Sequence, residues 1–235
     1  MSTSEPARDS SSSDARSWRE QAVARSLDSA RTKAENRVQR FMEAALELID
    51  TGNGKDFTVQ EVVERSGQSL RSFYQHFDGK HELLLALFEE SILTTVEFLS
   101  EKVAGERDPL RRLHRFAIEY HRACCRPAGK GTSARKGLPP VMGEFAQQLL
   151  TEHPKEAAVA FEPLVSMFGE LLDEAIAAGA VRTDLPSRRL TGVVLEAIMF
   201  DAFSSTIGGT STRGDDQRAA EELWDLLLHG IASSG

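Results

Sequence analysis

Apolar side chains recur every three or four positions along most of this 235-residue chain. The pattern is firm from position 38, where Val38, Phe41, Met42, Ala45 and Leu48 fall on one side of a helical wheel. This spacing is typical of an amphipathic helix. No segment alternates apolar and polar residues with enrichment in β-branched types, as a half-buried strand would. The sequence therefore predicts an all-α fold.

Further helices follow to the end of the chain. The same periodicity predicts helices over 80–103, 110–124, 141–150, a single helix from Pro154 through Leu172, 187–207 and 215–232. Between 103 and 187 the breaks fall at Gly- and Pro-rich stretches, above all the basic loop that precedes Pro139. Residues 1–15 are Ser-rich and aperiodic, and Trp18 to Lys33 has only a thin apolar face. Residues 1–33 are therefore expected to be disordered or partly helical, either extending the next helix or folding only on a partner.

Two short helices are predicted between residues 58 and 77, separated by Gly67. Thr58 followed by Glu61 has the spacing of a capping box that opens the first helix. Gly67 ends it, because glycine adopts the left-handed conformation at little cost, and Ser69 can cap the second helix. Val63 and Phe73 stand where a helix-turn-helix needs a compact residue in the first helix and a large apolar one in the second.

The second short helix then presents polar side chains at its N-terminal end, the end that enters a major groove. Arg71 can bind guanine bidentately, Gln75 can pair with adenine, and Leu70 offers an apolar contact to a thymine methyl. Thr58, Tyr74 and Lys80 suit phosphate oxygens. The full set of candidate DNA-binding residues is Thr58, Ser69, Leu70, Arg71, Ser72, Tyr74, Gln75, His76 and Lys80.

The net charge of −8 does not exclude a DNA partner, because the acidity lies mostly beyond residue 80. Residues 16–40 hold seven Lys or Arg and three Asp or Glu residues, a local excess of four positive charges. No apolar run approaches the roughly 18 residues that would span a bilayer, and the N-terminus lacks a signal-peptide layout. We expect a cytoplasmic protein with no membrane partner. The two cysteines are adjacent and provide no disulfide framework.

The stretch from Val38 to Leu85 resembles the DNA-binding domain of TetR-family (tetracycline-repressor-like) transcriptional regulators. The residues that carry the resemblance are Thr58, Gly67, Tyr74, Phe77, Lys80 and Leu83. Two positions depart from it: Gln68 stands where the family usually has Val or Ile, and Val63 where it usually has Ala. The resemblance implies a DNA-binding domain at 34–80 and an effector-binding and dimerisation domain at 81–235. It also implies a repressor that binds a palindromic DNA operator as a homodimer.

The helices after residue 80 supply candidates for both implied roles. Ala219, Leu223, Leu226 and Gly230 form one stripe, and residues 190–203 are apolar on nearly all sides, so the last two helices are expected to form the homodimer interface. A small hydrophobic effector is expected in a pocket of aromatic, Met and small side chains. The candidates are Phe98, Leu113, Ala117, Tyr120, His121, Phe145, Phe161, Val165, Phe168 and Met199.

Other chemistry is not expected. His121 and Cys125 share a helix face, but Cys124 and Cys125 lack the spacing of zinc ligands, so no metal site and no cofactor are predicted. The loop around Lys130 lacks the residues of a nucleotide-binding loop, although its basic side chains leave a contact to an anionic effector open. No catalytic triad or carboxylate pair stands out, and an enzyme is not expected. The alternative function is a helical ligand-binding module that has lost DNA binding, for which Gln68 is the clue.

Overall fold

Helices make up the fold throughout the residues described by this computed structural model, namely 18–51, 57–125, 140–181, 184–207 and 215–231. They run in the order α1 (Trp18–Thr51), α2 (Val59–Ser66), α3 (Leu70–Tyr74), α4 (Lys80–Val103), α5 (Pro109–Cys125), α6 (Pro140–Glu152), α7 (Pro154–Ala160), α8 (Glu162–Ala177), α9 (Ser187–Ile207) and α10 (Asp215–Ile231). No β-strand occurs within these ranges, so the all-α prediction is confirmed. In the same ranges, none of the helices combines the length and apolar character needed to cross a membrane.

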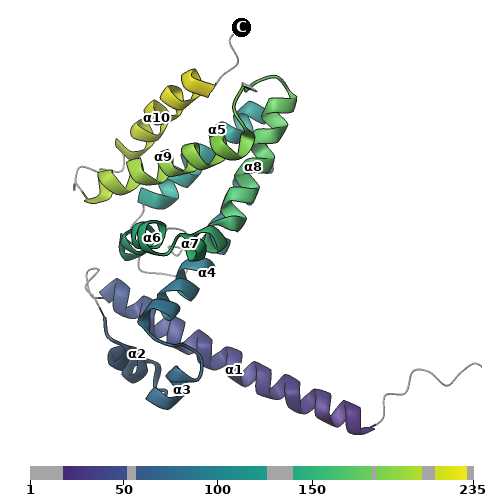
Figure 1. Cartoon of the computed structure of the whole chain (residues 1–235), viewed down its shortest axis with the longest axis vertical. Helices are drawn as coiled ribbons and strands as arrows, with labels where there is room; N and C mark the ends of the chain where they lie inside the picture. The colour runs from purple at the N-terminus through teal and green to yellow at the C-terminus, as the bar shows by residue number, and fades with distance from the viewer. Residues whose placement is uncertain (1–17, 52–56, 126–139, 182–183, 208–214, 232–235) are drawn as a thin grey trace, which may run out of the picture.

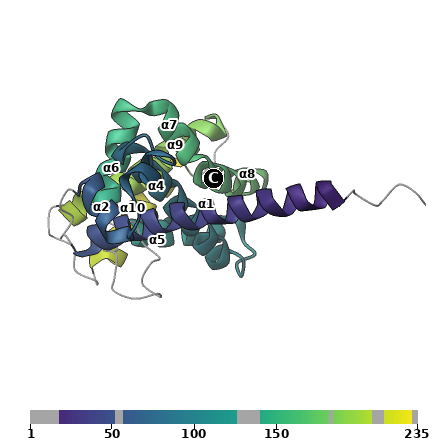
Figure 2. The same cartoon turned by 90° about the horizontal axis from the view of Figure 1, so that it is seen from below.

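The chain divides into a small N-terminal group of helices and a larger bundle, joined by α4. Figure 1 shows α2 and α3 beside the C-terminal half of α1, with α4 leading from them into the bundle of α5 to α10. The segment from Trp18 to Lys33 is the N-terminal part of α1, continuous with the rest of that helix. The N-terminal end of α1 projects away from the rest of the molecule in both views (Figures 1 and 2). Residues 1–17 lie outside the described residues.

An aromatic cluster holds the N-terminal helices together. The Phe41 ring on α1 meets the Phe73 ring on α3 edge to face, with ring centroids 5.3 Å apart. Phe77 lies 5.4 Å from Phe73 and 6.3 Å from Phe41, and all three side chains are buried. Edge-to-face pairs of this kind add to the stabilisation from burial alone. The cluster therefore fixes α3 against α1.

Helix α5 is the centre of the larger bundle, because α4, α8, α9 and α10 all pack against it. Its buried side includes Leu113, Phe116, Tyr120 and Cys124. Phe116 also stacks at 5.1 Å from Phe168 of α8. The bundle thus has one continuous apolar core.

The prediction of a single helix from Pro154 through Leu172 is wrong in one respect, since the structure divides this stretch into α7 and α8 at Phe161. Pro163 occupies the first turn of α8 and has no N–H to donate to the preceding turn. The chain therefore turns at Phe161, and α8 takes a new direction. Phe168 and Leu172 are buried as expected, whereas Val165 is partly exposed.

Candidate DNA-binding surface and ligand cavity

The helix-turn-helix is built by local hydrogen bonds that the sequence predicts. The Thr58 hydroxyl accepts from the Glu61 amide at 3.2 Å, and the Glu61 carboxylate accepts from the Thr58 amide at 2.7 Å, which completes the capping box. The hydrogen bond from the Thr58 amide lowers the pKa of Glu61, so this carboxylate stays charged. Gly67 has φ 65° and donates to the Glu64 carbonyl, and the Ser69 hydroxyl accepts from the Ser72 amide at 3.1 Å.

The exposed side chains of α3 and of its two capping residues make up most of the predicted DNA-binding set. Exposed members of the predicted set are Thr58, Ser69, Leu70, Arg71, Tyr74 and Gln75. Ser72 and His76 are half-buried instead, and neither the Ser72 hydroxyl nor His76 Nε2 has a hydrogen-bond partner among the residues that the structure describes. Val63 and Phe73 are both buried, and α2 packs on α3, as the predicted crossing requires.

Lys80 lies at the junction between this surface and the bundle. It is the first residue of α4, and its ammonium group stands 4.6 Å from the centroid of the Phe57 ring. Partial burial lowers the pKa of Lys80. A lysine placed over an aromatic face keeps its charge oriented, so it can still meet a phosphate at the edge of the helix-turn-helix.

A cavity of about 810 Å³ opens among α6, α7, α8 and α9. Its volume falls in the range of about 300–1,000 Å³ that small-molecule sites occupy. The apolar lining is Leu150, Pro154, Ala157, Ala158, Phe161, Val165, Leu195 and Met199. Four charged side chains also border it: Glu162, Asp173, Arg188 and Glu196.

One residue of the cavity wall has a buried hydroxyl group without a hydrogen-bond partner among the described residues. Thr191 is 2% exposed and lines the cavity, yet its hydroxyl makes no hydrogen bond within the part of the chain that the structure describes. A buried hydroxyl left in that state costs free energy, which a bound ligand or water can recover. Sequence reasoning missed Thr191, whose one signal is a hydroxyl in a largely apolar stretch.

Only part of the predicted pocket set lines this cavity: Phe161, Val165 and Met199. The other seven predicted residues do not line it: Phe98, Leu113, Ala117, Tyr120, His121, Phe145 and Phe168. Most of them lie in the core of the bundle. They were included in the predicted set because helical periodicity identifies buried positions but does not separate a filled interior from a hollow one.

The residues around His121 form an internal hydrogen-bond network. Nε2 of His121 lies 2.9 Å from Asp201 of α9, and Nδ1 lies 3.6 Å from the Cys125 sulfur. Burial raises the pKa of the Cys124 thiol to about 12, so it stays protonated at neutral pH. The basic loop around Lys130 lies outside the described residues.

Comparison with known proteins gives a family-model match in the N-terminal part of the chain and a structural similarity that extends into the helical bundle. Residues 41–87 match the family model "Bacterial regulatory proteins, tetR family". No curated protein sequence gives a significant match. Among solved structures, similarity extends over most of the chain.

Three of these structures illustrate the shared fold. FadR from Bacillus subtilis with stearoyl-CoA is 16% identical, covers 82% of this chain and 98% of its own, and gives a TM-score of 0.62. FadR from Thermus thermophilus, a TetR-family repressor with lauroyl-CoA, is 21% identical over 84% of this chain and 96% of its own, with a TM-score of 0.63. RolR with resorcinol is 18% identical, covers 85% of this chain and 89% of its own, and gives a TM-score of 0.62.

Proposed function

From the tetR-family DNA-binding domain that this chain carries, we propose that it is a homodimeric repressor released from a palindromic operator by a small, largely apolar effector. The observation that supports this most strongly is the exposed face of α3, held rigidly by the Phe41 and Phe73 rings. We assign residues 34–80 to DNA binding and 81–235 to effector binding and dimerisation, with 1–33 as an N-terminal extension. This role places the protein in the cytoplasm.

The direct test is binding to duplex DNA from upstream of its own gene, measured by gel shift and fluorescence anisotropy. Specific retardation at moderate salt supports the regulator. A purified protein that ignores every duplex at low salt would favour the alternative, a ligand-binding module. The half-buried Gln68 and the departure it represents would then mark where DNA binding was lost.

Arg71→Ala is expected to weaken operator binding by about 1–3 kcal/mol and to relax the preference for one base, because Arg71 is exposed at the N-terminal end of α3. Lys80→Ala should weaken binding to all sequences evenly and reduce the salt slope by about one. Arg65→Ala is the matched control, since Arg65 pairs with Glu47 of α1 at 3.3 Å. Equal losses on operator and random DNA for Arg71→Ala would contradict base recognition.

The homodimer is proposed from an uncovered apolar face on α9 and α10. Val193 and Phe200, seven residues apart on α9, are 53% and 46% exposed, and Leu226 of α10 is 71% exposed. Figure 1 shows α9 and α10 at the end of the bundle, and the two helices contact each other. Leu226 belongs to the predicted stripe, while Ala220 and Trp224 face inward. A second copy of the chain can cover this face on both subunits at once, as a twofold interface does.

The effector class follows from the cavity walls. The apolar lining suits a hydrocarbon or aromatic body, and the Thr191 hydroxyl suits one hydrogen-bonding group on it. Three acidic side chains and one arginine border the cavity, which opposes a polyanionic end such as the coenzyme A of the FadR ligands. We therefore propose a neutral or cationic effector, nearer in chemistry to the resorcinol bound by RolR.

Thr191→Val should weaken effector binding by about 0.5–1.5 kcal/mol while leaving the free protein as stable or more stable, because it removes an unsatisfied buried hydroxyl and keeps the shape. Resorcinol, dodecanol and lauroyl-CoA serve as probes in thermal-shift and calorimetric titrations. Ser166→Ala is the control, since the Ser166 hydroxyl already donates to Glu162. If a probe that binds the wild type also binds Thr191→Val with unchanged affinity, Thr191 is excluded from the site.

A further inference from the structure

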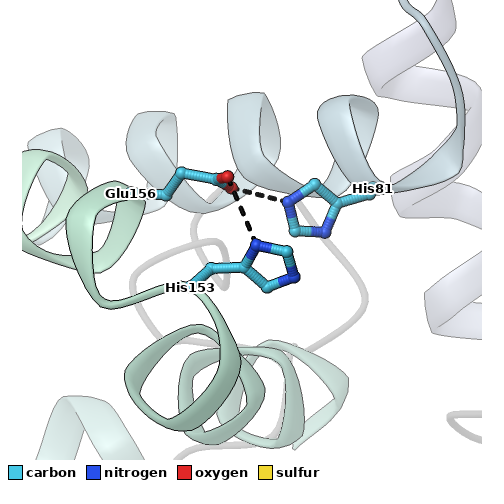
Figure 3. A group of neighbouring side chains, drawn as sticks. All are labelled: His81, His153 and Glu156. Atoms are coloured by element: carbon cyan, nitrogen blue, oxygen red, sulfur yellow. Dashed lines mark hydrogen bonds and ion pairs between the residues drawn. The ribbon is translucent and has the colours of Figure 1, made fainter.

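Two histidines and a glutamate meet between the start of α4 and the start of α7. His81 is the second residue of α4, His153 immediately precedes α7, and Glu156 lies in the first turn of α7. The Glu156 carboxylate lies 2.6 Å from Nε2 of His81 and 3.3 Å from Nδ1 of His153 (Figure 3). The two imidazole rings lie 4.5 Å apart with 35° between their planes.

These groups converge closely enough to share one ion. One ligand atom from each residue lies within 4.8 Å of the others. Around a tetrahedral zinc ion with bonds of 2.0–2.1 Å, ligand atoms lie about 3.3 Å apart. All three side chains are half-buried, so small rotations can close the difference.

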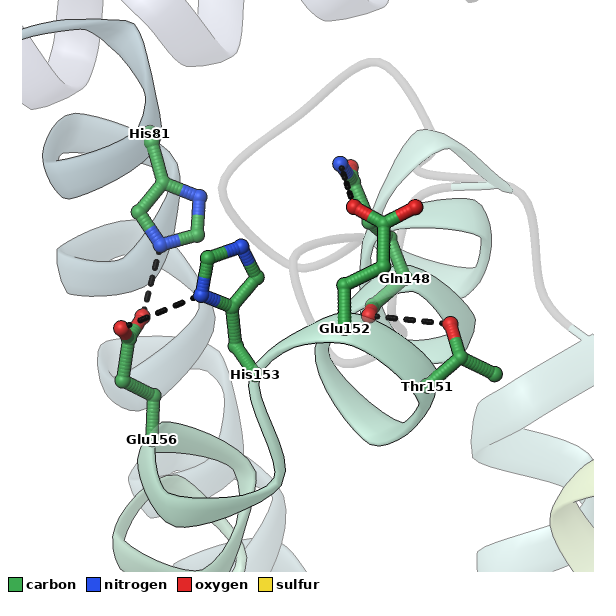
Figure 4. Close-up of polar contacts among 6 residues, drawn as sticks. All are labelled: His81, Gln148, Thr151, Glu152, His153 and Glu156. Atoms are coloured by element: carbon green, nitrogen blue, oxygen red, sulfur yellow. Dashed lines mark hydrogen bonds and ion pairs between the residues drawn. The ribbon is translucent and has the colours of Figure 1, made fainter.

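The backbone around His153 is fixed on both sides. Its amide donates to the Leu149 carbonyl at 2.9 Å and its carbonyl accepts from the Ala157 amide at 3.0 Å. Figure 4 shows the last turn of α6 beside it, where the Thr151 hydroxyl donates to main-chain carbonyls and Glu152 accepts from Gln148. Glu152 is therefore engaged on α6, and the convergent set is two nitrogens and one carboxylate.

We propose that His81, His153 and Glu156 form a binding site for a zinc-class divalent metal ion. Two imidazoles with one carboxylate suit zinc, cobalt or nickel, whereas magnesium and calcium prefer sites made of oxygen ligands. A hollow of about 340 Å³ lined by Asp78, His81, Glu82 and Glu156 gives an ion and its water access from solvent.

The ion would link two functional parts of the molecule. His81 follows Lys80 at the end of the helix-turn-helix, and α7 supplies Pro154, Ala157 and Ala158 to the cavity wall. Metal binding would therefore fasten the DNA-binding end of α4 to a wall of the proposed effector site. This consequence, unlike the ion site itself, rests on the proposed function.

The chain offers a matched control in a second histidine–carboxylate pair. Nε2 of His114 on α5 lies 2.7 Å from the Glu221 carboxylate on α10, with similar exposure of both side chains. Within the described part of the chain, no third ligand joins this pair. Substitutions in a metal site at His81, His153 and Glu156 should therefore weaken metal binding, whereas substitutions in the His114–Glu221 pair should not.

The test is calorimetric titration of the tag-free full chain with Zn²⁺, together with the visible absorption of added Co²⁺. One ion per chain should bind, with affinity at least tenfold weaker in His153→Ala and Glu156→Gln and unchanged in His114→Ala and Glu221→Gln. Circular dichroism establishes that each variant is folded. Absence of binding, or equal binding by Glu156→Gln and the wild type, would overturn the site. Operator affinity unaffected by Zn²⁺ in a protein that binds it would overturn the link to DNA and leave the ion site standing.

Discussion

Phe73→Ala should lower the free energy of unfolding of the N-terminal helices by about 3–5 kcal/mol, the usual cost of removing a fully buried phenylalanine. Phe73 is 0% exposed, and its ring meets those of Phe41, Tyr74 and Phe77 at 5.3, 5.5 and 5.4 Å. The three rings around Phe73 would lose their contacts with it, and α3 would lose its aromatic contact with Phe41 of α1. Operator binding should be lost in parallel, as measured by urea unfolding and fluorescence anisotropy.

The adjacent residue provides the control. Tyr74 is 56% exposed on the same helix, so Tyr74→Ala should change stability by less than about 1 kcal/mol while still weakening DNA binding. Phe73 would then act through the fold and Tyr74 through contact with DNA. A Phe73→Ala protein that kept wild-type stability would show that α3 is not held by the aromatic cluster.

The parts of the structure that sequence predicts well are those fixed by near neighbours in the chain. The capping box joins Thr58 to Glu61, and Ser69 caps the amide of Ser72. Gly67 adopts its left-handed conformation within the same short stretch. Since each interaction spans no more than three residues, the local pattern was sufficient to locate the helix-turn-helix.

Features that depend on distant packing could not be predicted in the same way. His81 and Glu156 are 75 positions apart, and nothing in either local pattern indicates that they meet. Ser72 and His76 belong to the predicted DNA-binding set but are half-buried, because the packing of α3 and of the turn after it decides their exposure. The cavity likewise includes Phe161, the residue at which α7 ends and α8 follows, together with residues of α6 and α9 that are distant in sequence.

Leu226→Glu should convert the proposed homodimer to monomers, raising its dissociation constant at least a hundredfold. Leu226 is 71% exposed in the single chain and would be buried against a second copy. At a twofold interface the substitution places two carboxylates in an apolar contact, and each buried, unpaired charge costs several kcal/mol. Sedimentation velocity measures the change directly.

The same substitution at Leu93 is the control, because that side chain is 52% exposed on α4, a helix that packs mainly on α5 and α8 rather than on α9 or α10. Leu93→Glu should leave the dimer intact, and both variants should keep the helical content of the wild type. A Leu226→Glu protein that associates as tightly as the wild type would exclude this face as the interface.

Loss of the dimer should also reduce operator affinity far more than loss of any single DNA contact. Two linked recognition helices bind a palindrome with the second contact made at high effective concentration, an advantage of about 10²–10⁴ that monomers lack. The α3 surface of the Leu226→Glu monomer remains folded, so its affinity for an isolated half-site should match that of the wild type. Anisotropy measured on full and half operators separates the two effects. Equal loss on both would mean that the substitution damages the fold, since dimerisation contributes only where two half-sites are present.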